Sequence, residues 1–94
     1  MGIFSNFFSF TQELAIDLGT ANTVIISGGE IVVNEPSVVA LDRHTEKMIA
    51  VGDVAKQMYE KTNDKIRVIR PLRDGVIADF NAAEQMLRGL IKMV

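Results

Sequence analysis

The chain has 94 residues, a net charge of −2 at pH 7, one histidine and no cysteine. A chain of this length forms one small domain or part of a larger one. The missing cysteines exclude disulfides and thiolate metal sites, as is typical of a reducing cytoplasm. Charged residues make up 23% of the sequence without forming a basic tract, so no nucleic-acid partner is expected.

Residues 1–12 contain no charged side chain and hold four of the five phenylalanines of the chain. The apolar residues Ile3, Phe4, Phe7 and Phe8 recur at the spacing of one helix face. One interpretation is a membrane-binding segment in the headgroup region. It would bind by apolar burial, since it has no lysine or arginine to attract anionic lipid. The alternatives are a terminal helix or strand packed on the chain's own core, or disorder.

Residues 14–26 predict a strand, a tight polar turn and a returning strand. Gly19 lets a ligand approach the backbone, and successive N–H groups in such a turn form an anion-binding concavity. The hydroxyls of Thr20 and Thr23 add donors for a phosphate. Asp17, just before the turn, is placed to hold a hydrated Mg²⁺ ion, which takes few carboxylates. The alternative is an ordinary β-turn without a ligand.

Glycine and proline divide the middle of the chain into short elements. Pro36 predicts that the chain leaves the first sheet at residues 34–36, because proline cannot donate to a sheet. The expected elements in order are a turn at 27–30, strands at 31–33, 37–41 and 48–51, a helix from its N-cap Asp53 to about Lys61, a strand at 66–72 and a turn at 74–75.

The last segment predicts an amphipathic helix. Asn81 and Glu84 have the spacing of a capping box, with asparagine in place of serine or threonine. Gly89 lies inside the expected helix, at a cost of about 1 kcal/mol relative to alanine, so packing must hold it there. Apolar residues follow at helical spacing, at Ala83, Met86, Leu87, Leu90, Ile91 and Val94.

Four stretches, in this order, resemble the MreB family of actin-like ATPases: IDLGTANT at 16–23, NEPSVVA at 34–40, VGDVAKQM at 51–58 and IRPLRDGVIADF at 69–80. The resemblance implies an α/β chain with the actin-like ATPase (ribonuclease H-like) fold, present as an incomplete N-terminal part with the small inserted subdomain. It assigns residues 13–34 and 75–94 to the large subdomain with the phosphate-binding hairpin. Residues 35–74 would form the small inserted subdomain.

The resemblance also assigns roles within the hairpin. Gly19, Thr20, Ala21 and Asn22 match the nucleotide-phosphate turn of the family, and Asp17 matches its magnesium-associated carboxylate, with water between. ATP and Mg²⁺ are therefore the implied cofactors. Three features of the family have no match in this sequence: its second phosphate turn, its adenosine-binding glycines and the carboxylate that orients the attacking water. No catalytic residue is assigned, enzymatic activity is left open, and the isolated chain is expected to bind nucleotide weakly at best.

By resemblance, the chain is expected to be the N-terminal portion of an ATP-binding, actin-like filament protein that determines rod cell shape. The implied partners are further copies of itself, the cytoplasmic membrane surface and membrane proteins of the cell-wall elongation machinery. The implied location is the cytoplasm, peripheral at the inner membrane face. Two alternatives stay open: a short non-enzymatic module that binds membrane or filaments, and another actin-fold ATPase such as a DnaK-like chaperone.

Overall fold

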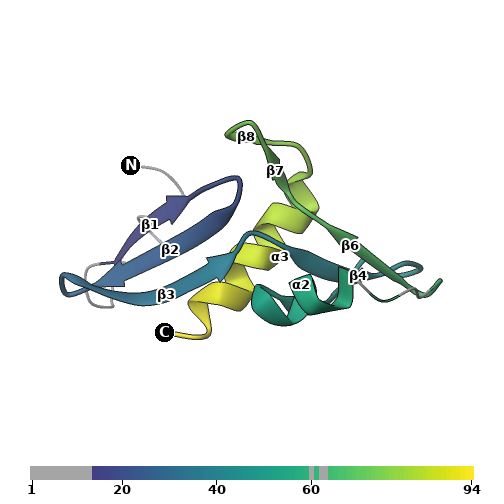
Figure 1. Cartoon of the computed structure of the whole chain (residues 1–94), viewed down its shortest axis with the longest axis horizontal. Helices are drawn as coiled ribbons and strands as arrows, with labels where there is room; N and C mark the ends of the chain where they lie inside the picture. Colours follow the sequence, from purple (N-terminus) through teal and green to yellow (C-terminus); the bar gives the residue numbers. More distant parts are fainter. Residues whose placement is uncertain (1–13, 60, 62–63) are drawn as a thin grey trace.

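The computed structural model describes residues 14–59, 61 and 64–94, so the expected membrane-binding segment at residues 1–12 lies outside the described part. In that part, short strands form three antiparallel sheets, and two helices pack beside them (Figure 1). The elements are β1 (Leu14–Leu18), β2 (Asn22–Ser27), β3 (Glu30–Pro36), β4 (Val39–Asp42), β5 (Met48–Val51), α2 (Asp53–Tyr59), β6 (Ile66–Ile69), β7 (Leu72–Arg73), β8 (Val76–Ile77) and α3 (Phe80–Ile91).

The first sheet has the strand order β1-β2-β3. The β2–β3 hairpin turns through Gly28 and Gly29, both at positive φ, as the mirror-image turns of tight hairpins require. The strand expected at residues 31–33 is longer in the structure, and the chain leaves this sheet at Pro36, the last residue of β3, which pairs with Asn22. Proline is tolerated there because it is the last residue of an edge strand.

The second sheet, in the order β5-β4-β6, has its central strand buried on both faces. Ala40 packs in a cluster with Ala55 of α2, whereas the alternate residues Val39 and Leu41 belong to the cluster that includes α3. A strand covered on both faces is apolar throughout, which explains the continuous apolar run of β4. Helix α2 includes Asp53 as its first residue and ends at Tyr59, earlier than expected.

The strand expected at residues 66–72 is two strands in the structure. β6 ends at Ile69, and Leu72 begins β7, which pairs with β8 to form the third sheet. Pro71 lies between them and has no N–H for a sheet ladder, but its carbonyl oxygen accepts from the Ala78 N–H at 2.8 Å and from the Asp79 N–H at 3.3 Å. These bonds tie the segment just before α3 to Pro71.

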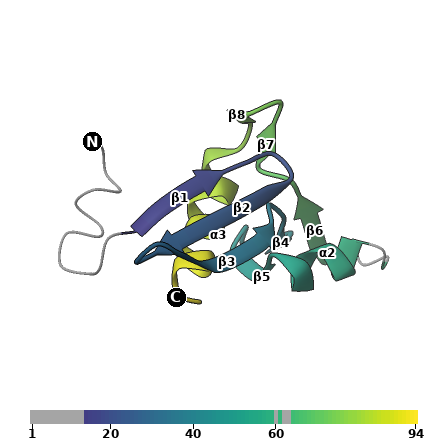
Figure 2. The ribbon, with the colours of Figure 1, turned by 60° about the vertical axis from the view of Figure 1, so that its left-hand side comes forward.

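Helix α3 closes the main core and lies against both larger sheets (Figure 2). A Cβ at Gly89 would lie 2.6 Å from Cε of Met48 and 3.2 Å from Cγ1 of Val51, so close packing does hold this glycine in the helix. No helix among the described residues is long and apolar enough to cross a membrane. The buried members of the main core are Ile25, Val33, Val39, Leu41, Val51, Leu72, Ala82, Met86 and Leu90.

The start of α3 differs from the predicted capping box. Asp79 is the N-cap, at φ −141° and ψ 105°, and its carboxylate accepts a hydrogen bond from the Ala82 N–H at 3.0 Å. The pairing of Asn81 with Glu84 as a cap is therefore wrong. The predicted apolar face is confirmed through Ile91, which is partly buried against the main core, but α3 ends there and Val94 is exposed.

Candidate nucleotide-phosphate site

The turn between β1 and β2 folds residues 19–22 into one tight loop. The Gly19 N–H donates to the Asn22 carbonyl oxygen at 3.1 Å, and the pairing of Leu18 with Thr23 closes the hairpin beside it. A Cβ at position 19 would lie 2.6 Å from the same carbonyl oxygen, so a side chain would force the turn open. Glycine is needed here because the chain reverses so tightly that the Asn22 carbonyl oxygen occupies the space of a side chain at position 19.

Ser37 holds the turn from within the protein. Its hydroxyl donates to the Gly19 carbonyl oxygen at 2.6 Å, and its N–H donates to the Ala21 carbonyl oxygen at 2.8 Å. The fully buried Thr23 hydroxyl lies 2.8 Å from Oγ of Ser37. Because the single Ser37 hydroxyl proton goes to Gly19, Thr23 is the donor of this pair. The prediction that Thr23 donates to a phosphate is therefore wrong, and its hydroxyl instead orients Ser37.

Thr20 connects the turn to the tip of the β7–β8 hairpin. Its Oγ1 accepts a hydrogen bond from the Gly75 N–H at 2.7 Å. Asp74 and Gly75 both have positive φ, 53° and 77°, which shapes the hairpin tip. Since the Thr20 hydroxyl acts as acceptor in this bond, its own proton stays available for a ligand.

The open side of the turn presents backbone donors. Within the part of the chain that the structure describes, the N–H groups of Thr20 and Ala21 have no hydrogen-bond acceptor. Ala21 is exposed and Thr20 is half-buried. Two neighbouring N–H groups without an acceptor, together with a hydroxyl proton, are donors of the kind that bind a phosphate oxygen.

Asp17 supplies a carboxylate on the strand that leads into this turn. It lies on β1, ahead of the turn, and is exposed. Among residues 14–59, 61 and 64–94, no three His, Cys, Asp or Glu side chains gather into a metal site. A single carboxylate suits Mg²⁺ only where the ion keeps several waters and takes phosphate oxygens as further ligands. The donor set thus fits a Mg²⁺-bound phosphate better than a metal held by protein alone.

The structure brings together four of the predicted residues, Gly19, Thr20, Ala21 and Asn22, in one turn. Their contact with a nucleotide and the contact of Asp17 with Mg²⁺ stay predictions. The predicted membrane-binding residues Ile3, Phe4, Phe7 and Phe8 lie outside the described residues.

Sequence reasoning missed two residues that shape the turn, Ser37 and Gly75. The only signal for Ser37 was a small hydroxyl between Pro36 and an apolar run. Gly75 was recognised as part of a turn, with nothing in the sequence to indicate its partner Thr20.

The fold matches solved structures of actin-like proteins. MreB5 of Spiroplasma citri bound to AMPPNP superposes with a TM-score of 0.75 at 43% identity, over 83% of this chain and 24% of that protein. The same protein bound to ADP gives a TM-score of 0.76 at 42% identity, over 84% of this chain and 24% of that protein. The chain therefore has part of an actin-like fold.

The sequence comparisons identify the family. The family model of the MreB/Mbl protein matches residues 11–94, and the chain belongs to the MreB/Mbl family. It is 54% identical over 83 residues to the cell shape-determining protein Mbl of Bacillus cereus, covering 87% of this chain and 25% of that protein. It is 53% identical over 90 residues to the cell shape-determining protein MreB of Escherichia coli, covering 90% of this chain and 26% of that protein. The chain thus spans about a quarter of the length of these relatives.

Proposed function

We propose that this chain is the N-terminal portion of an ATP-binding filament protein that determines rod cell shape. The observation that carries the proposal is the turn at residues 19–22, with the free N–H groups of Thr20 and Ala21 and the available proton of the Thr20 hydroxyl. The related S. citri protein, bound to AMPPNP and ADP in its structures, supports a nucleotide as the ligand.

In this proposal the turn receives a phosphate of ATP, and Asp17 orients the water shell of Mg²⁺. The ion would neutralise phosphate charge when bound, which is its usual contribution in phosphoryl transfer. Ser37 and Gly75 make no contact with the ligand. They hold the Gly19 carbonyl oxygen and the Thr20 hydroxyl in place without a ligand.

Amide chemical-shift mapping, titrated to the highest soluble concentration of Mg-ATP, tests the nucleotide site on the chain itself. We expect the largest shifts at the Thr20 and Ala21 amides, and we expect Gly19→Ala to remove them. Asp17→Asn keeps the fold and should abolish the difference between ATP with and without Mg²⁺. Glu30→Gln, an exposed carboxylate elsewhere on the same sheet, is the matched control. Equal effects of Asp17→Asn and Glu30→Gln would refute the Mg²⁺ role, and shifts scattered away from the turn would refute the site.

The proposal extends to the partners. The protein would assemble with copies of itself, lie in the cytoplasm at the inner membrane face, and contact membrane proteins of the cell-wall elongation machinery. The uncharged, phenylalanine-rich residues 1–12 would bind the membrane by apolar burial. Vesicle co-sedimentation should therefore survive high salt and be abolished by Phe7→Glu with Phe8→Glu. Unchanged pelleting of this double variant would contradict the membrane-binding role.

The competing proposal is a short non-enzymatic module that binds membrane or filaments. An antibody against this segment separates the two in the native cells. A species several times heavier than 10.4 kDa supports the ATP-dependent filament protein. A native species near 10.4 kDa supports the short module.

A further inference from the structure

The tip of the β7–β8 hairpin contains an Asp-Gly peptide, a dipeptide prone to spontaneous rearrangement. Asp74 is the only aspartate or asparagine of the chain that is followed by a glycine. Because glycine has no side chain to hinder its nitrogen, that nitrogen can attack the carboxyl carbon of the preceding aspartate. Asp74 and Gly75 are both exposed, and a Cβ at position 75 would meet no atom within 4 Å. No packing around Gly75 therefore blocks the reaction among the described residues.

The rearrangement needs only water and the residues themselves. The Gly75 nitrogen forms a bond to Cγ of Asp74 and loses its proton, while one oxygen of the protonated carboxyl group leaves as water. A second water then opens the five-membered imide at either of its carbonyl carbons. One opening restores aspartate, and the other gives isoaspartate, in which the main chain runs through the side-chain carbons of residue 74.

Thr20 opposes this reaction from the neighbouring turn. The Gly75 N–H donates to Oγ1 of Thr20 at 2.7 Å, between the β7–β8 tip and the β1–β2 turn (Figure 2). Ring closure consumes this proton, so the hydrogen bond is lost when the nitrogen reacts. The pairing of Arg73 with Val76 and the positive φ of both tip residues also fix the two-residue turn. The hydrogen bond to Thr20 therefore adds to the barrier of the rearrangement.

A second hairpin shows that the turn geometry alone does not protect such a nitrogen. Ser27 pairs with Glu30 around Gly28 and Gly29, so Gly29 has the same turn position as Gly75 and also a positive φ, 81°. Within residues 14–59, 61 and 64–94, the Gly29 N–H has no acceptor. The protection of the Gly75 nitrogen thus depends on Thr20 and does not come with the type of turn.

We infer that Asp74 is a site of isoaspartate formation, and that the Thr20 hydroxyl controls its rate. In the product the main chain between residues 74 and 75 is longer by one carbon atom. A two-residue turn of the present shape cannot form with this longer path, and the Gly75 N–H leaves Thr20. The β1–β2 turn then loses its contact with the β7–β8 hairpin. The effect of that loss on phosphate binding rests on the proposed function, whereas the modification itself does not.

Incubation of the chain at neutral pH tests the inference. Enzymatic methylation specific for isoaspartate measures the amount formed, and loss of Asp-N protease cleavage before residue 74 locates it. We expect the chain unfolded in guanidinium chloride to react fastest and the folded chain slowest. Thr20→Val should react about two- to tenfold faster than the folded unmodified chain, as expected for the loss of one hydrogen bond. Thr20→Ser keeps the hydroxyl and should stay slow, and Asp74→Glu should form no isoaspartate at this position.

Thr45→Val is the matched control, since exposed Thr45 also accepts from a backbone N–H in a hairpin loop, that of Lys47 at 3.2 Å. The inference is overturned if Thr20→Val reacts no faster than Thr45→Val or the unmodified chain. If Thr20→Val does not fold, amide exchange in the unmodified chain decides: Gly75 should exchange more slowly than Gly29, and equal rates overturn the inference. Isoaspartate formation as expected, in a chain that binds no nucleotide, would refute the proposed nucleotide site and support the modification.

Discussion

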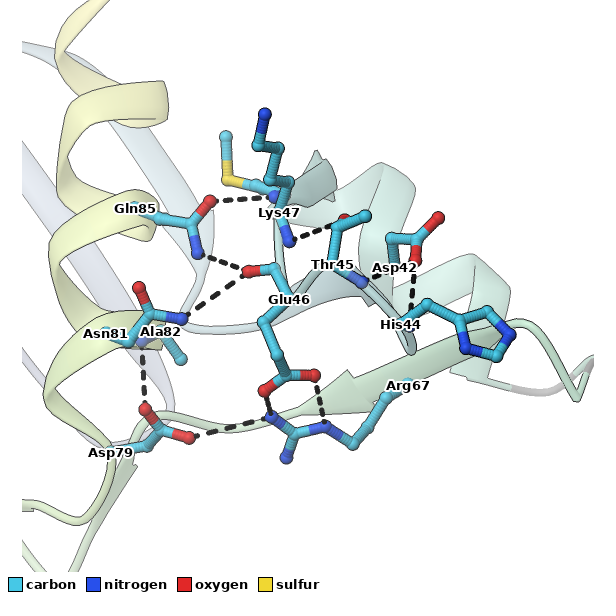
Figure 3. Close-up of polar contacts among 11 residues, drawn as sticks. Asp42, His44, Thr45, Glu46, Lys47, Arg67, Asp79, Asn81, Ala82 and Gln85 are labelled. Carbon is cyan, nitrogen blue, oxygen red and sulfur yellow. Dashed lines mark hydrogen bonds and ion pairs between the residues drawn. The ribbon is translucent and has the colours of Figure 1, made fainter.

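Gln85 is predicted to hold the β4–β5 hairpin onto α3 (Figure 3). Its Oε1 accepts from the Met48 N–H and its Nε2 donates to the Glu46 carbonyl oxygen, both at 2.7 Å. Each bond contributes about 0.5–1.5 kcal/mol, and an unsatisfied half-buried N–H costs about 1–3 kcal/mol. The Glu46 carbonyl keeps a weaker bond from Asn81 at 3.4 Å, so Gln85→Ala should lower the free energy of unfolding by about 2 kcal/mol.

Urea denaturation followed by circular dichroism measures this loss. With a slope of about 1 kcal/mol per molar urea, the midpoint of Gln85→Ala should fall by about 2 M. Gln57→Ala is the control, because exposed Gln57 makes one bond to Asp53 at 3.2 Å and should change stability by less than about 0.5 kcal/mol. If the variant is too unstable to titrate, amide exchange at Met48 should be faster by about 30-fold. Equal losses for Gln85→Ala and Gln57→Ala would refute the bridging role.

A carboxylate at position 85 provides a second test of these two hydrogen bonds. In Gln85→Glu the carboxylate can still accept from the Met48 N–H, but it cannot donate to the Glu46 carbonyl oxygen unless it is protonated. The folded state therefore favours the protonated form and raises the pKa of the new side chain above the unfolded value of about 4.3. Relative to the original chain, Gln85→Glu should be nearly as stable below about pH 4.3. It should lose stability as the pH rises through the raised pKa that the new side chain has in the folded state.

Further variants test three other local features. Asp79→Ala should cost about 1 kcal/mol of unfolding free energy because it removes the N-cap of α3, whereas Asn81→Ala should cost less. Gly52→Ala should destabilise strongly, because its φ is 70° and a Cβ would collide with the Glu35 carboxylate that accepts from the next N–H. Hydrogen bonds from the backbone N–H groups of Thr45 and then His44 lower the pKa of Asp42 below 3.8. The stability that the Asp42 carboxylate contributes is therefore complete above pH 3.8 and is lost as the pH falls through the lowered pKa. Urea titrations at several pH values should therefore show a smaller acid-side loss for Asp42→Asn.

The local features of the fold could be predicted because they depend on neighbouring residues. The Gly28–Gly29 hairpin, the apolar β4 and the buried face of α3 follow from turn chemistry and periodicity. The wrong predictions concern features that depend on residues far away in the sequence. The choice of Asp79 over Asn81 as N-cap depends on hydrogen bonds to the carbonyl oxygen of Pro71, which hold Asp79 in an extended conformation.

The same distinction applies to the candidate site. The turn at Gly19 is visible in the sequence, but the role of Thr23 depends on Ser37, fourteen positions later, and the role of Thr20 depends on Gly75, fifty-five positions later. Neither partner has a spacing that a local pattern can reveal. The error on Thr23 came from treating every hydroxyl near the turn as exposed, whereas the alternation of β2 buries that side chain.

Ser37 and Gly75 also affect how tightly this chain alone can bind a phosphate. Because Ser37 and Gly75 hold the turn in place without a ligand, little conformational entropy is lost when a phosphate binds. Two N–H groups and one hydroxyl that each contribute about 1.5–2 kcal/mol to a charged phosphate give about 5 kcal/mol. Association itself costs at least about 4 kcal/mol, so the net affinity is weaker than millimolar. A tight nucleotide site therefore needs contacts from elsewhere, and a quarter-length chain with a well-formed first turn is expected to bind ATP only very weakly.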